Sequence, residues 1–204
     1  MTGNPADPGS IAAVKAAARA EAKAQRRAAQ AAAGPDAGVR AAQNWMRLAG
    51  DVAGRTVAVY YAMGEEMPTL PLIAALNRAG AATALPVVAG RDRPLVFRAW
   101  APGDPLVSGG FGTSVPAADA PEAVPDILAV PLLAWDGEGY RLGYGGGFYD
   151  RTLAALRAAD PGVRAIGLAF AGQRVARVPR EATDIALDAL AHEAGIVRFG
   201  EETA

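Results

Sequence analysis

Short, continuous apolar segments separated by helical patterns are the feature that most limits the folds open to this sequence. Residues Thr56–Tyr61 are too continuously apolar for a strand with one face in water, so we expect a buried strand there, a second buried strand at Asp126–Pro131 and a further strand at Arg164–Phe170. Helical patterns lie at Leu70–Ala79 and Phe148–Ala159. This alternation predicts an α/β fold with a mostly parallel central sheet flanked by helices. Ligands of such folds bind beyond the carboxyl ends of the strands.

The remaining elements follow from composition and turn signals. Residues Ile11–Ala33 contain 13 Ala in 23 positions, with Ser10 as a candidate N-cap and Gly34-Pro35 as a stop, which predicts one long helix. We expect residues 1–10 to form a flexible N-terminus and residues 11–200 to form a single α/β domain. Further predictions are a helix at Asp36–Ala49, strands at Ala82–Val88, Leu95–Trp100 and Ala194–Phe199, and a long surface connection at Ala101–Pro125.

Charge and composition exclude several classes of function. The 204 residues include 20 Lys+Arg and 21 Asp+Glu, a net charge of −1 that argues against a nucleic-acid or membrane-coating partner. Without Cys and with one His, the chain has no thiolate chemistry and a His-based zinc site is not expected. The first residues lack a secretory pattern and no apolar run reaches the roughly 18 residues of a membrane span, so we expect a cytoplasmic protein.

A glycine-rich segment lies between a predicted strand and a predicted helix. Four of the five residues from Gly143 to Gly147 are Gly, so backbone N–H groups and a helix N-terminus could converge on an anion such as phosphate. The segment lacks the Gly-Lys-Ser/Thr ending of a P-loop, and Phe148 occupies the place of the third Gly in a dinucleotide fingerprint. Spacing alone leaves a structural turn and a phosphate cradle equally open. Arg141 favours the cradle because it adds a positive fork at the mouth of the loop.

Two charged features have both a structural and a functional interpretation. Asp150 could hold Mg²⁺ through its carboxylate and waters, although taken alone it is more often a first-turn carboxylate favoured by the helix dipole. At about 100° per residue, five basic residues of the first helix share an arc of roughly 120°. A solvated face is the commoner explanation of such a stripe. Its members are Lys15, Arg19, Lys23, Arg26 and Arg27.

Two further segments contain candidate polar residues. Tyr61 and Glu66 follow a buried strand at the end where ligands are expected, whereas core packing is the more frequent fate of Tyr60 and Met63. Near the C-terminus, two acids stand four residues apart, at Asp184 and Asp188, and either could be a cap or a metal ligand. The single His192 has no Ser or Asp pattern of a triad and is assigned a structural or solvated role.

From Lys15 to Glu193 the chain resembles the 5-formyltetrahydrofolate cyclo-ligase family. The most specific element is Arg141 to Asp150, which is similar to the family signature R-L-G-x-G-x-G-Y-Y-D. Lys15 to Arg19 resembles its K-x-x-x-R, and Met63 to Thr69 aligns with the segment whose acid contacts folate. Other similar segments are Gly110-Phe111-Gly112 with Pro116, which resembles G-x-F-G-I-x-E-P, and Asp126 to Trp135, which resembles P-D-L-x-x-V-P-x-x-x-F-D.

The resemblance implies an enzyme of the three-layer NagB/RpiA/CoA-transferase-like fold that works on small molecules as a monomer or weak homodimer. Its reaction would convert 5-formyltetrahydrofolate to 5,10-methenyltetrahydrofolate with ATP and Mg²⁺. The implied catalytic residues are Arg141 and Tyr149, and the implied metal ligands are Asp150 and Asp188. The implied ATP contacts are Lys15, Arg19, Arg141, Leu142, Gly143, Tyr144, Gly145, Gly146, Gly147, Phe148 and Tyr149. The implied folate contacts are Tyr61, Glu66, Tyr144, Gly145, Gly146, Gly147 and Phe148.

Three positions depart from the family pattern. Phe148 replaces the first Tyr of Y-Y-D, Pro68 interrupts the usual acid-x-acid-Thr spacing, and Thr183-Asp184 stands where many members have His-Asp. Two alternatives therefore stay open. One is a related enzyme that keeps the ATP site but acts on another substrate, and the other is a non-catalytic nucleotide-binding protein.

Overall fold

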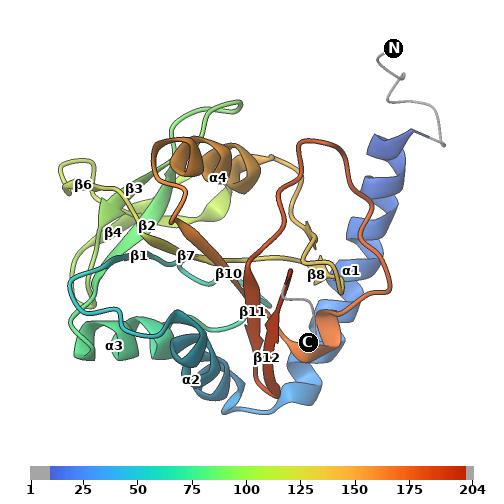
Figure 1. The fold of residues 1–204 in the computed structure, drawn as a ribbon, viewed down its shortest axis with the longest axis horizontal. Helices are drawn as coiled ribbons and strands as arrows, with labels where there is room; N and C mark the ends of the chain where they lie inside the picture. Colours follow the sequence, from blue (N-terminus) through green and yellow to red (C-terminus); the bar gives the residue numbers. More distant parts are fainter. Residues whose placement is uncertain (1–9, 201–204) are drawn as a thin grey trace.

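An eight-stranded sheet runs through the computed structural model, which describes residues 10–200 (Figure 1). Most of the flexible N-terminus predicted at 1–10 therefore lies outside the described residues. The helices are α1 (Ile11–Ala33), α2 (Ala37–Ala49), α3 (Leu70–Arg78) and α4 (Phe148–Ala159), with short 3-10 turns η1 (Gly110–Gly112) and η2 (Ala171–Gln173). The strands are β1 (Thr56–Ala58), β2 (Ala82–Val88), β3 (Leu95–Ala99), β4 (Leu106–Ser108), β5 (Ser114–Pro116), β6 (Glu122–Ala123), β7 (Ile127–Val130), β8 (Ala134–Trp135), β9 (Arg141–Leu142), β10 (Arg164–Leu168), β11 (Ala189–His192) and β12 (Gly195–Arg198).

The centre of the sheet is parallel, as the apolar runs predict. The strand order is β12-β11-β10-β7-β1-β2-β3-β6, in which β11, β10, β7, β1 and β2 are parallel and the outer strands β12, β3 and β6 each pair antiparallel with their inner neighbour. From β1 the chain crosses to β2 on one side, and from β7 it continues to β10 and β11 on the other. The carboxyl ends of β1 and β7 therefore border the point where the winding direction reverses, and such points are where open α/β sheets bind ligands.

Alternate residues of the strands face two helical layers. Val57 and Ile166 pack with α2 and α3, whose Trp45 and Leu72 are fully buried. The next residue of β1, Ala58, packs on the other face with Leu153 of α4. Figure 1 shows α4 on one side of the sheet and α2 with α3 on the other. The three-layer arrangement follows from strands that bury both faces.

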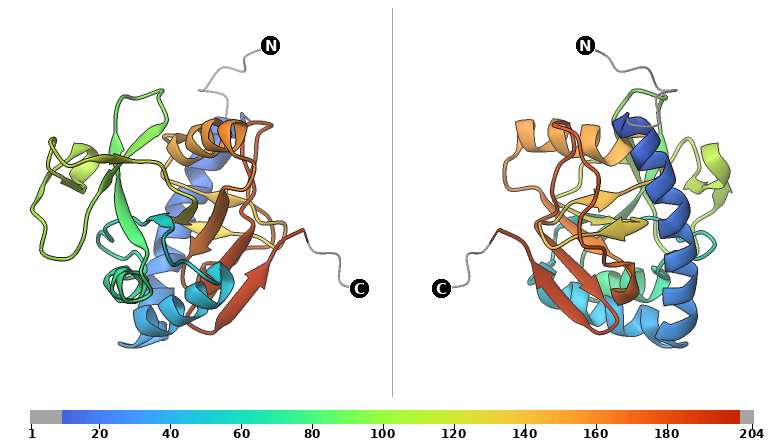
Figure 2. Two further views of the ribbon diagram at one scale, coloured as in Figure 1. Left: turned by 60° about the vertical axis from the view of Figure 1, so that its left-hand side comes forward. Right: turned by 90° about the vertical axis from the view of Figure 1, so that its right-hand side faces the viewer.

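Helix α1 lies at one end of these layers, against the β8–β9 hairpin and η2 (Figure 2). The hydroxyl of Ser10 accepts a hydrogen bond from the Ala13 N–H at 3.2 Å, and Gly34 ends the helix with φ +79°. Both ends follow the expected chemistry of an N-cap and of a left-handed glycine. The predicted bounds of α1, and those of α4, agree with the structure.

Three predictions about elements need correction. Residues Ala101–Pro125 are not a plain loop, because β4 and β5 pair there as a hairpin and β6 pairs with the edge strand β3. The run Thr56–Tyr61 is a strand only through Ala58. Strand β11 and the β8–β9 hairpin were not predicted at all, since strands of two to four residues have no distinctive local pattern and form through their partners.

Candidate functional site

The loop after β1 and the connection from β7 to α4 meet at the reversal point of the sheet. The loop after β1 contains Glu66, and the connection contains β8, β9 and then the glycine loop, Gly143–Gly147. They touch directly, because the Tyr144 hydroxyl donates a hydrogen bond to Glu66 Oε1 at 3.2 Å. Residues 78 positions apart in sequence are thereby joined at the edge of the sheet where a ligand is expected.

Two glycines of the glycine loop combine a positive φ with little room for a side chain. Gly145 has φ +103°, and a Cβ there would lie 3.0 Å from Cζ of Arg19. Gly147 has φ +62°, and a Cβ there would lie 2.7 Å from Nη1 of Arg151. Arg19 also donates from Nε to the Gly143 carbonyl at 3.0 Å. The loop therefore runs close under a guanidinium and leads directly into the N-terminus of α4, an arrangement that favours an anion.

Arg141, Asp150 and the Ile185 backbone form a fixed cluster beside this loop. Arg141 is 5% exposed in its side chain and donates from Nη2 to Asp150 Oδ1 at 2.8 Å. It also donates to the Ile185 carbonyl, while the Ile185 N–H donates to the same Asp150 oxygen at 3.1 Å. The contacts of Asp150 within the described residues run through Oδ1, and its side chain keeps 24% exposure. The other oxygen, Oδ2, can therefore face a cation.

The structure does not bring Asp150 and Asp188 together, so the predicted metal pair needs correction. Asp188 Oδ2 accepts from Arg157 at 2.7 Å and from the Ala165 N–H at 2.6 Å. Asp150 lies in the first turn of α4 and Arg157 in its last turn, which places them about 10 Å apart along the helix. Asp188 directly precedes β11, at the amino edge of the parallel strands, and these two contacts hold it there.

Asp184 is the acid that lies near Asp150. It directly precedes Ile185, whose backbone holds both Asp150 and Arg141. Its Oδ2 accepts from Lys15 Nζ at 2.6 Å, and Glu181 Oε2 accepts from the same ammonium at 2.8 Å. Burial alone would lower the pKa of Lys15, but the hydrogen bonds that its ammonium donates to Asp184 and Glu181 outweigh burial and raise the pKa. Lys15 therefore stays charged beside two carboxylates.

Glu66 is a buried acid that contacts the glycine loop through Tyr144. It is 6% exposed, and its Oε2 accepts from the Met63 N–H at 2.9 Å. Burial raises the pKa of this carboxyl, although the Met63 N–H, the positive charge of Arg26 and the Tyr144 hydroxyl act in the other direction. Such a carboxyl can exchange a proton nearer to neutral pH than an exposed Glu.

Aromatic side chains surround the two loops. Tyr61 meets Trp100 edge-on at 5.9 Å between ring centroids, and Phe148 meets the exposed Phe111 at 6.0 Å. Burial, with a smaller contribution from the negative Glu66, raises the pKa of Tyr149, so its phenol stays protonated. These rings could lie against a flat heterocycle.

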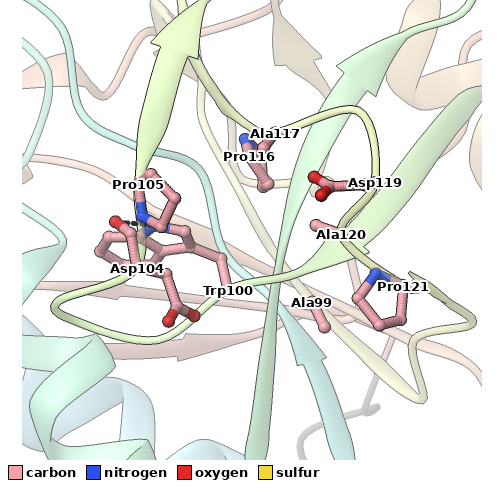
Figure 3. Close-up of a pocket in the computed structure, with 9 residues that line it drawn as sticks. All are labelled: Ala99, Trp100, Asp104, Pro105, Pro116, Ala117, Asp119, Ala120 and Pro121. Carbon is pink, nitrogen blue, oxygen red and sulfur yellow. Dashed lines mark hydrogen bonds between the residues drawn. The ribbon is translucent and has the colours of Figure 1, made fainter.

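Trp100 also lines a half-open pocket of about 300 Å³. In Figure 3, Trp100 and Asp104 form one side and the loop with Asp119 and Pro121 forms the other. The Trp100 indole donates to the Asp104 carbonyl at 3.2 Å. None of the predicted site residues lines this pocket, so it is separate from the glycine loop.

The acidic residues suit a cation that is shared with a ligand. Within residues 10–200 no group of three or more His, Cys, Asp or Glu side chains could hold a metal by itself. Mg²⁺ is commonly bound through one or two carboxylates together with substrate phosphates and waters. Asp150 and the nearby Asp184 fit that pattern, although Asp184 accepts a hydrogen bond from Lys15 in this structure.

Most of the predicted site residues therefore lie around the glycine loop. Leu142 is 3% exposed and packs in the core, so its side chain is not available to a ligand. Reasoning from sequence missed the proximity of Asp184 to Asp150 and the burial of Arg26, which is 4% exposed. The basic stripe of α1 is only in part a solvated face: Lys15 and Arg26 are buried and Arg19 contacts the glycine loop, whereas Lys23 and Arg27 are exposed. No helix in this part of the chain is long and apolar enough to span a membrane.

The fold and the site together define an α/β protein that has a glycine loop flanked by basic side chains at the reversal point of its sheet. Residues 11–193 match the profile of the 5-formyltetrahydrofolate cyclo-ligase family. The chain belongs to this family, and it is an enzyme.

Relatives in three bacteria carry the name 5-formyltetrahydrofolate cyclo-ligase. The Escherichia coli K12 protein is 37% identical over 163 residues, which cover 76% of this chain and 87% of that protein. The Haemophilus influenzae protein is 33% identical over 150 residues, covering 71% and 79%. The Mycolicibacterium smegmatis protein is 36% identical over 146 residues, covering 67% and 72%.

Two solved structures share the fold. The NMR structure of Aquifex aeolicus 5,10-methenyltetrahydrofolate synthetase has a TM-score of 0.69 and 26% identity, and the match covers 90% of this chain and 95% of that one. The Mycoplasma pneumoniae 5,10-methenyltetrahydrofolate synthetase has a TM-score of 0.66 at 19% identity, covering 88% and 98%. The predicted α/β fold with a mostly parallel central sheet is confirmed.

Proposed function

We propose that this enzyme converts 5-formyltetrahydrofolate to 5,10-methenyltetrahydrofolate, using ATP and Mg²⁺ and releasing ADP and phosphate. The observation that carries the proposal is the direct hydrogen bond between Tyr144 of the glycine loop and the buried Glu66, because it makes a phosphate site and a substrate site adjacent. The names of the relatives and of the similar structures support the choice of substrate.

The reaction needs an activated formyl oxygen, since an amide-like oxygen is a poor leaving group. Attack of that oxygen on the γ-phosphorus of ATP breaks the bond to ADP and forms an imidate-type phosphate. The folate N10 then attacks the formyl carbon and loses its proton, and the carbon–oxygen bond breaks to release phosphate. Such a transfer depends mostly on positioning and on neutralising charge.

The residues around the glycine loop are suited to the ATP phosphates. We assign this role to the backbone N–H groups of Gly143–Gly147, to Arg19 and to Arg141, with Leu142 contributing through its backbone. Lys15 is held beside the same cluster by Asp184. When bound, Mg²⁺ would neutralise phosphate charge, with Asp150 and Asp184 as the acids that hold it.

The aromatic residues and the acid that surround the glycine loop are suited to the folate ring system. Tyr61, Phe148 and Tyr149 supply aromatic surface, and Glu66 can accept hydrogen bonds from ring N–H groups. The protonated phenol of Tyr149 can donate a hydrogen bond toward the transferred phosphoryl group.

The test is to follow the near-ultraviolet absorbance of 5,10-methenyltetrahydrofolate with purified protein, 5-formyltetrahydrofolate, ATP and Mg²⁺. With the protein present, we expect the signal to grow only when 5-formyltetrahydrofolate, ATP and Mg²⁺ are all added, and to stop when a chelator removes the metal. ATP binding without that signal would instead support a related enzyme with another substrate. Absence of both binding and signal would contradict the proposal.

A further inference from the structure

Arg26 connects three elements that the reaction would use together. It lies on α1, 118 residues before Tyr144 in sequence, and its Nη1 donates to the Tyr144 hydroxyl at 2.8 Å. The same hydroxyl donates to Glu66 Oε1 at 3.2 Å, which makes a chain of two hydrogen bonds in one direction. The guanidinium also lies over the Tyr144 ring, with Cζ 5.6 Å from the centroid. A hydrogen bond in such a chain strengthens its neighbour.

The surroundings of Arg26 are poorly suited to a purely structural role. Its nearest carboxylate oxygens are 3.7 Å away on Glu65 and 4.0 Å away on Glu66, both long for an ion pair. Its Nε is buried and makes no hydrogen bond to the described residues. A buried cation with incomplete partners costs stability that an apolar side chain of similar size would not cost. The guanidinium at this position is therefore better explained by what it orders.

We propose that Arg26 is a positioning residue for the folate site, holding Tyr144 and, through its hydroxyl, the Glu66 carboxylate in the orientation that binds substrate. The inference rests on the proposed function and adds a residue outside the segments that resemble the family motifs. Arg26 would also tie the glycine loop to the turn that contains Glu66, so that the two substrate sites are ordered together.

The proposal has an electrostatic consequence that can be measured without substrate. Glu66 is faced by Arg26 from α1, by Tyr144 from the glycine loop, by Tyr60 after β1 and by Tyr149 from α4. Burial raises the pKa of Glu66, while Arg26 and Tyr144 lower it. Loss of either partner should therefore raise the pKa of Glu66 further.

The kinetic test compares Arg26→Met with Arg27→Met. Arg27 is the next residue, 73% exposed in its side chain, and it pairs with Glu65 at 2.9 Å rather than with Glu66. We expect Arg26→Met to raise the KM for 5-formyltetrahydrofolate by about tenfold to a hundredfold, with a smaller change in kcat, and Arg27→Met to leave both unchanged. Arg26→Lys should recover part of the loss because it restores the charge.

A second variant keeps the test informative if Arg26→Met does not fold. Tyr144→Phe removes one hydroxyl from a half-exposed ring and should raise the same KM by several-fold. In the double variant the two effects should not multiply, since each breaks the same chain of hydrogen bonds. A KM that changes less than about threefold in both single variants, or effects that multiply fully, would overturn the proposal.

Carboxyl NMR titration separates failure of this inference from failure of the proposed function. In protein labelled at the Glu side-chain carbon, the Glu66 pKa should rise in Arg26→Met and in Tyr144→Phe but not in Arg27→Met. If the wild type makes no 5,10-methenyltetrahydrofolate yet these shifts appear, the substrate assignment fails and the positioning role stands. If the Glu66 pKa does not respond to either partner, the positioning role fails whatever the activity.

Discussion

Asp184 and Asp188 stand four residues apart, and their neighbours give them different roles. Asp188 is bonded to Arg157 and to the Ala165 N–H at the amino edge of the sheet. Asp184 holds Lys15 and adjoins Ile185, which contacts Asp150 and Arg141. The sequence offers both as equivalent candidates, because nothing in the local pattern shows which acid lies against the backbone that meets Asp150. The position of Asp150 beside the glycine loop could be predicted, because the helix N-terminus in which it lies is recognisable from the local sequence.

We predict that Asp184→Asn and Asp188→Asn have opposite signatures. Asp184→Asn should raise the Mg²⁺ concentration needed for half-maximal rate by about tenfold or more, since it removes a charge beside Asp150. Asp188→Asn should leave that requirement unchanged and lower the thermal midpoint, because it weakens the contact with Arg157. Mg²⁺ titration of the initial rate, with thermal melts of both proteins, checks the pair. A larger Mg²⁺ effect from Asp188→Asn than from Asp184→Asn would instead support Asp188 as the metal ligand.

At the scale of elements, α1 contributes charge to the site and little apolar surface to the core. Lys15, Ala22 and Arg26 are its buried residues, while Arg19 reaches the Gly143 carbonyl. A long Ala-rich helix provides a rigid rod on which these side chains are spaced by whole turns. The helix therefore presents fixed positive charge to the glycine loop and to the segment that contains Asp184.

We predict that neutralising this charge weakens ATP binding. Lys15→Met and Arg19→Met should each raise the KM for ATP by about tenfold, because each removes a cation beside the phosphate loop. Lys23→Met is the matched control: the residue is exposed on the same helix, and its KM should equal that of the wild type. Initial rates at varied ATP concentration provide the measurement. Equal effects in all three variants would mean that net charge alone matters.

Elements were predictable where their signals are local. The bounds of α1 and α4 followed from a capping Ser, from glycines with positive φ and from helix-forming residues between them. The hairpin of β4 and β5 and the strand β11 were missed because their pairing partners decide them. Leu106 pairs with Pro116, and Ala189 pairs with both Ile166 and Arg198. The link between Arg26, Tyr144 and Glu66 is likewise a product of the tertiary fold.

For the whole molecule, the buried Glu66 makes stability depend on pH. Its pKa in the folded chain is raised above the ordinary value of 4.5, so the folded state binds this proton more tightly than the unfolded state. Between the two pKa values, the free energy of unfolding falls as the pH rises. The ionised Glu66 carboxylate, which the proposed substrate site requires, therefore lowers the free energy of unfolding.

Replacing Glu66 by Gln should therefore stabilise the protein while removing activity. Gln has the shape of the protonated acid and cannot ionise, so the variant should exceed the wild type in free energy of unfolding at about pH 8 and match it near pH 4. Urea unfolding at a series of pH values gives both curves. A Glu66→Gln protein less stable than the wild type at the higher pH would show that the ionised form is favoured by its partners.

Helix α1 is attached to the β8–β9 hairpin and to η2, and in addition through contacts that the ligands would use. Two of its three buried residues, Lys15 and Arg26, are charged and face loops of the candidate site. Release of the helix would therefore also remove the ligand-binding charges from the site. Nucleotide and folate, by binding the attached form, would slow amide hydrogen exchange and protease cleavage along α1 more than elsewhere, and occupancy of the site would set how long the segment survives in the presence of a protease.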